Sequence, residues 1–165
     1  MEPRVAPLHT IFQLNTRLFL NCFENASDDL ARSRPRQASN SMAYIALHLH
    51  DARHYLAKYL AVAEPDPFAA ITADAADIDD IEIYPSIAEL RTAWMEISMA
   101  LENRFPQLTS ASIAEPSPPD APDFPVGDNT VLGGIAFLLQ HEAYHLGQLA
   151  YLRKLLGLPA MSWHT

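Results

Sequence analysis

The chain has 165 residues, of which 49% are hydrophobic and 19% are charged, and its formal net charge at pH 7 is −9. This length fits one domain, and the composition is that of an ordinary soluble globular protein. The excess of acids argues against nucleic acid or an anionic membrane as the main partner, because both are bound through clustered lysine and arginine. No apolar run approaches the roughly 20 residues that span a bilayer, and no signal-peptide core is present, so we expect a cytoplasmic protein with no membrane partner.

Prolines punctuate the chain, and the stretches between them carry apolar residues at helical spacing. This pattern predicts four helices, over about residues 7–30, 40–62, 86–104 and 129–156. Six of the thirteen prolines lie between Pro106 and Pro125, which predicts a crossover over residues 105–128 that is not the interior of a helix. We therefore expect a single all-α domain over residues 1–165, a four-helix bundle with long crossover connections.

Two of the seven histidines, His141 and His145, are four residues apart on the last predicted helix, so they share one face. The same face carries six apolar residues that should point into the bundle: Val131, Ile135, Leu138, Leu149, Leu152 and Leu156. Burying two imidazoles is unfavourable unless each finds a partner. A divalent metal ion is one such partner. Two core histidines hydrogen-bonded to neighbouring side chains are the alternative.

The second predicted helix supplies a third metal ligand. His48 lies on its inward-facing stripe, whereas His50 and His54 lie beside Asp51 and other charged residues. We expect His48 to join His141 and His145 around the metal. The competing pair, His50 and His54, is interpreted as a half-exposed polar flank.

Residues 141–145 also match the metalloprotease signature H-E-x-x-H, in which Glu142 would act as the general base. The match is incomplete, because Gly147 stands one position too early for the extended motif and residue 151 is tyrosine. Glu142 also lies about 100° around the helix from His141, towards a neighbouring helix. A protease is therefore disfavoured, and Glu142 remains a candidate base for hydrolysis.

Two blocks, residues 40–49 around His48 and residues 130–159 around His141 and His145, resemble the DinB/YfiT-like superfamily of metal-binding four-helix bundles. The resemblance covers nearly the whole chain. It implies a site of three histidines that usually holds zinc or nickel, with the remaining coordination positions open to water or substrate. It also implies homodimers, and enzymes that often transfer a low-molecular-weight thiol such as mycothiol, bacillithiol or glutathione.

Three protein ligands with an open position are typical of catalytic rather than structural zinc sites. The leading hypothesis is a thiol S-transferase that acts on a small electrophile. The only cysteine of the chain, Cys22, lies in an apolar stretch, and this reaction does not need it as a nucleophile. The alternatives are a hydrolase that uses metal-activated water and a non-enzymatic bundle that binds a metal or ligand. Gln148 and Tyr44, each one turn from a predicted metal ligand, are expected to support the site. Gly147 is expected to permit close helix approach.

Overall fold

The computed structural model describes residues 1–164 except 38, 74, 76 and 119–123. Within these residues, regular structure consists of helices, apart from one isolated antiparallel β-bridge between Pro116 and Thr130. The predicted all-α class is therefore confirmed. Among the same residues, none of the helices combines the length and apolar character that crossing a bilayer requires.

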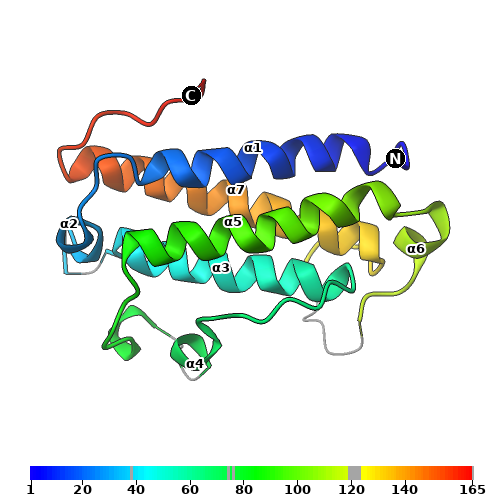
Figure 1. Ribbon diagram of the computed structural model, residues 1–165, viewed down its shortest axis with the longest axis horizontal. Coiled ribbons are helices and arrows are strands. Elements are labelled where there is room, and N and C mark those ends of the chain that lie inside the picture. The colour runs from blue at the N-terminus through cyan, green and yellow to red at the C-terminus, as the bar shows by residue number, and fades with distance from the viewer. Residues whose placement is uncertain (38, 74, 76, 119–123, 165) are drawn as a thin grey trace.

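Four long helices lie side by side along the long axis of the molecule (Figure 1). They are α1 (Ala6–Cys22), α3 (Met42–Tyr59), α5 (Ile87–Arg104) and α7 (Val131–Leu155). Helix α7 packs against α1 and α3, and α5 packs against the same two helices from the other side. The α3–α7 and α1–α7 contacts are the most extensive, so the histidines predicted on α3 and α7 lie on directly packed helices.

Short helical segments occupy the connections between the long helices. They are α2 (Asp28–Arg32), α4 (Ala69–Thr72), η1 (Ile78–Asp80), η2 (Phe105–Gln107) and α6 (Ser110–Ala114). The proline-rich crossover thus contains two helical segments that the sequence did not indicate. Helix α6 begins at a capping box, in which Thr109 and Ser112 bind each other's backbone N–H groups.

The first helix is shorter than the predicted span of 7–30, because it ends at Cys22 and the chain turns before α2. Beyond the helix end, Asn25 adopts a left-handed conformation with φ of 60°, so the helix does not continue into α2. The buried guanidinium of Arg153 donates hydrogen bonds to the carbonyl oxygens of Cys22 and Glu24, at 2.7 and 2.8 Å. These contacts satisfy carbonyls that a helix end leaves unpaired. They come from a residue more than a hundred positions away.

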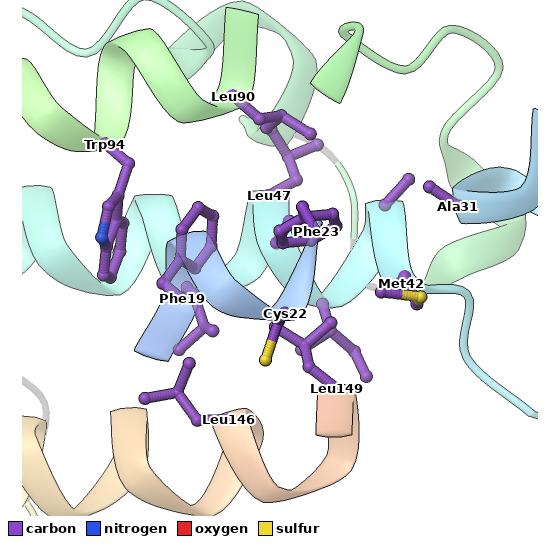
Figure 2. Packing of buried hydrophobic residues seen from close by; sticks show 14 of the residues in the cluster. Phe19, Cys22, Phe23, Ala31, Met42, Leu47, Leu90, Trp94, Leu146 and Leu149 are labelled. Carbon is purple, nitrogen blue, oxygen red and sulfur yellow. The ribbon is translucent and has the colours of Figure 1, made fainter. Parts of the chain in front are cut away.

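Buried apolar side chains from the four long helices form the core. In the region drawn in Figure 2, the ring of Phe19 stacks on Trp94 with 4.1 Å between ring centroids, and Leu146 and Leu149 of α7 face α1. Cys22 belongs to this core and is fully buried. Burial raises the pKa of its thiol to about 12, against a smaller opposing effect of Arg153. Cys22 is therefore a protonated packing residue at neutral pH.

The close approach of α3 and α7 depends on Gly134 rather than on Gly147. A Cβ atom on Gly134 would lie 2.1 Å from Cε1 of Tyr59, a distance that no real side chain can occupy. A Cβ atom on Gly147 would meet nothing within 4 Å, and Gly147 is exposed. The prediction that Gly147 permits close packing was wrong, because this residue lies on the solvent face of α7.

Candidate metal centre

Helices α3 and α7 bring His48, His141 and His145 together. Nε2 of His141 lies 3.0 Å from Nε2 of His48 and 3.1 Å from Nε2 of His145. The three ligand atoms all lie within 4.8 Å of one another, and each histidine is half-buried. The i, i+4 spacing on α7 places two rings on one face, and the packing of α3 against α7 supplies the third.

Gln148 fixes the orientation of one of these rings. Its side-chain carbonyl oxygen lies 2.7 Å from Nδ1 of His145. Because a carbonyl oxygen only accepts hydrogen bonds, Nδ1 carries the proton and the Nε2 lone pair of His145 faces the other two histidines. Histidines that bind metals in proteins are held by contacts of this kind.

Burial keeps the three imidazoles neutral. It lowers the pKa of His141 to about 4, with smaller contributions from His145 and His48. It also lowers the pKa of His48, with a contribution from His145, and it lowers the pKa of His145. At neutral pH the site therefore presents uncharged nitrogen donors that converge on one point, which is the form of histidine that binds metal ions.

The arrangement fits a divalent cation. In a tetrahedral zinc site the Zn–N distance is about 2.0–2.1 Å, which places two ligand nitrogens about 3.3 Å apart. The two observed N–N distances, 3.0 and 3.1 Å, are shorter by only a few tenths of an ångström. Both short contacts run from Nε2 of His141, and a single proton on that nitrogen cannot point along both of them. One cation bound between the rings would satisfy all three nitrogens at once.

Aromatic rings surround the cluster. The ring of Tyr44 lies nearly parallel to that of His48, with an interplanar angle of 7° and 6.5 Å between centroids. Tyr144 meets His145 edge-on at 5.0 Å, and Phe137 stacks on His141 at 6.2 Å. Tyr44 therefore contacts a ligand ring rather than a ring nitrogen. These aromatic rings lie around the three histidines, which are themselves half-buried.

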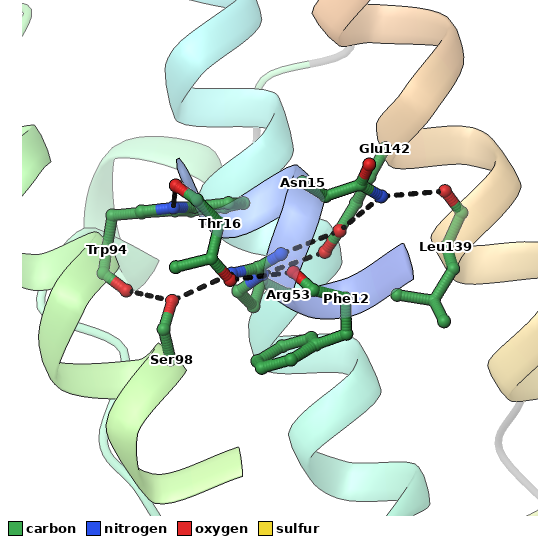
Figure 3. Close-up of polar contacts among 8 residues, drawn as sticks. All are labelled: Phe12, Asn15, Thr16, Arg53, Trp94, Ser98, Leu139 and Glu142. Carbon is green, nitrogen blue, oxygen red and sulfur yellow. Dashed lines mark hydrogen bonds and ion pairs between the residues drawn. The ribbon is translucent and has the colours of Figure 1, made fainter. Parts of the chain in front are cut away.

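Glu142 is buried in the protein interior, where its carboxylate meets Arg53 and Asn15 (Figure 3). Its carboxylate accepts two hydrogen bonds from the guanidinium of Arg53, at 2.8 and 2.7 Å, and one from Nδ2 of Asn15 at 3.1 Å. The side chains of Arg53 and Glu142 are 0% and 1% exposed. These contacts argue against Glu142 as a general base, because the carboxylate is already paired with Arg53 and almost fully buried.

The third guanidinium nitrogen of Arg53, an NH2 group, connects the other helices to this ion pair. Nη1 donates to the hydroxyl oxygens of Thr16 and Ser98, both at 2.7 Å. The guanidinium also lies over the ring of Trp94, 3.5 Å from its centroid. Together with Glu142, these contacts join all four long helices (Figure 3). They fix the rotation of α7 about its axis and so the direction in which His141 points.

The sequence analysis missed Arg53 as a buried residue, although a signal was present. Leu49, Leu56 and Leu60 are fully or almost fully buried, and Arg53 occupies the same stripe four residues after Leu49. An arginine in an apolar stripe indicates a buried acidic partner. The partner, Glu142, is 89 residues away in sequence.

The prediction for His50 and His54 was wrong. Both were interpreted as a half-exposed flank, but they are 0% and 7% exposed. The segment that follows α3 covers them, and Phe68 meets the ring of His50 edge-on at 4.9 Å. The helical pattern of α3 alone did not show this, because the covering residues come from an irregular connection.

The fold and the site together define an all-helical protein with a cluster of three histidines suited to a divalent metal ion. Comparison with protein families matches the DinB superfamily over residues 11–149. The chain therefore belongs to the DinB superfamily, as its sequence resemblance indicated. The matched region contains His48, His141 and His145. A comparison with curated proteins returns no significant match.

Proposed function

We propose that this protein is a metal-dependent enzyme in which His48, His141 and His145 hold one divalent ion, and that it transfers a low-molecular-weight thiol to a small electrophile. The observation that carries the proposal is the convergence of three Nε2 atoms from two packed helices. Zinc or nickel suits such a donor set. The arrangement of the long helices supports a four-helix bundle with crossover connections as the scaffold.

When bound, the metal supplies a Lewis acid that lowers the pKa of a coordinated thiol or water. The three imidazoles are neutral, so they leave the full charge of the cation to attract an anionic thiolate. His145 is oriented for this role by Gln148. The protein has no thiolate of its own to offer, since Cys22 is buried and its pKa is raised to about 12. The sulfur nucleophile is therefore supplied by a co-substrate.

Hydrolysis with Glu142 as the base is less well supported. The carboxylate is paired with Arg53 and almost fully buried, so it is not available to accept a proton from water at the metal centre. A hydrolase would need a different base, for which Asp51 is a candidate because it lines the same small cavity as His48. A protein that binds metal without turnover remains the non-enzymatic alternative, and the same experiment distinguishes it.

The test is thiol consumption by metal-loaded protein. Zinc- or nickel-loaded wild type is mixed with mycothiol, bacillithiol or glutathione and a panel of small electrophiles, and the remaining free thiol is measured. We expect turnover that a chelator abolishes and that His145→Ala lacks. His164→Ala is the matched control, because His164 is an exposed histidine near the C-terminus and should keep full activity.

Three results would change the assignment. Thiol turnover that survives chelation would contradict the proposal. Cleavage of esters or amides without any thiol would favour the hydrolase. Metal binding that raises the melting temperature, with no turnover of any substrate, would favour the binding protein. Gln148→Ala adds a test of ligand positioning, with metal affinity expected to fall about 10- to 100-fold.

A further inference from the structure

A second group of potential metal ligands lies on a different face of α3. It consists of His50, His54 and Asp66, whose ligand atoms lie within 4.8 Å of one another. Nδ1 of His50 is 3.7 Å from Oδ1 of Asp66, and the rings of His50 and His54 are 4.9 Å apart. His48 and His50 are two residues apart on the helix, so their side chains point about 200° away from each other. This group is therefore separate from the first centre.

Several buried nitrogens of this group lack a close hydrogen-bond partner. Within normal hydrogen-bond distance and angle, neither ring nitrogen of His50 is paired and Nε2 of His54 is not, although both side chains are buried. The backbone of Ala93 lies near the ring of His50 and that of Glu64 near the ring of His54, so the group is weakly rather than fully satisfied. The 3.7 Å separation of His50 from Asp66 is too long for a hydrogen bond. Leaving buried polar atoms without a close partner is unfavourable. A metal ion that accepts one lone pair from each ring would remove part of this penalty.

The surroundings favour a cation and give it a route from solvent. A cavity of about 470 Å³ is lined by His54 and Asp66 and also by Asp51, Glu64 and Lys58. Three carboxylates and one ammonium group therefore face this space, so the local charge is negative. Asp66 is already held in place, because its Oδ1 accepts a hydrogen bond of 2.8 Å from the backbone N–H of Phe68.

We propose that His50, His54 and Asp66 form a second site for a divalent transition metal ion, reached from the cavity beside α3. Two imidazoles and one carboxylate are a donor set that zinc accepts, with the remaining position open towards the cavity. Bound there, the ion ties the segment that follows α3 to the helix. Because Asp66 comes from that irregular segment and both histidines come from α3, the ion adds a direct link between the segment and the helix.

The test counts zinc ions per chain. Protein is stripped with a chelator, exchanged into excess Zn²⁺, freed of unbound ion by gel filtration and analysed by mass spectrometry. Wild type and the His164→Ala control are expected to hold about two ions, and His54→Ala and His145→Ala about one each. Circular dichroism checks that every variant is folded. Asp66→Asn, which keeps the size of the side chain, provides a milder variant with zinc affinity at this site lowered at least about tenfold.

The outcomes separate the two metal sites. Wild-type protein that holds a single ion, lost in His145→Ala and kept in His54→Ala, overturns the second site. A single ion that is lost in His54→Ala and kept in His145→Ala supports the second site and contradicts the proposed catalytic one. If His54→Ala does not fold, unchanged zinc affinity and stoichiometry in Asp66→Asn overturn the proposal.

Discussion

Replacing Glu142 with glutamine should destabilise the protein strongly without removing the metal ligands. The guanidinium of Arg53 would stay fully buried and lose the carboxylate that now accepts two of its hydrogen bonds, at 2.8 and 2.7 Å. Breaking a buried ion pair by removing one partner is typically unfavourable by about 3–5 kcal/mol. For a chain of this length that corresponds to a fall in melting temperature of the order of 10 °C.

The assay is urea denaturation followed by circular dichroism, with metal content measured in parallel. Glu96→Gln is the matched control, because Glu96 is an exposed glutamate on α5, and its change should stay within about 0.5 kcal/mol. The double variant Arg53→Met/Glu142→Leu removes both charges and should recover much of the lost stability. An unchanged denaturation midpoint in Glu142→Gln would refute the structural role of the pair. The single variants Arg53→Met and Glu142→Leu complete the cycle. A double variant whose loss equals the sum of these two single losses would also refute the role of the pair, since that sum means no coupling.

The other predictions concern helix packing and pH. Gly134→Ala should lower the melting temperature, because the added Cβ would collide with the ring of Tyr59. Gly147→Ala should instead raise the free energy of unfolding by about 0.5–1 kcal/mol, because the added Cβ meets open space. Burial lowers the pKa of His141 and of His50 to about 4, so between pH 6.5 and 4 the unfolded chain binds protons that the folded chain does not. Metal-free protein should therefore lose stability as pH falls through this range, and urea denaturation of His141→Ala should show a weaker pH dependence than wild type.

The sequence by itself determined the helical class and the approximate positions of the long helices, because proline punctuation and apolar spacing act locally, although it did not show that the first helix ends at Cys22. It also predicted which three histidines come together. The i, i+4 spacing of His141 and His145 places them on one face, and His48 lies on the inward face of its own helix. Resemblance to the DinB superfamily was confirmed by the family match over residues 11–149. These features follow from local geometry and from motifs that are contiguous in the chain.

Only the tertiary structure decided the environment of the polar residues. Glu142 was a candidate base until its burial against Arg53 was seen, and that pair joins residues 89 positions apart. His50 and His54 resembled a polar flank until an irregular segment was found to cover them. The physical reason is the same in both cases. Periodicity shows which face of a helix a residue occupies, whereas burial and charge pairing depend on distant residues that pack against that face.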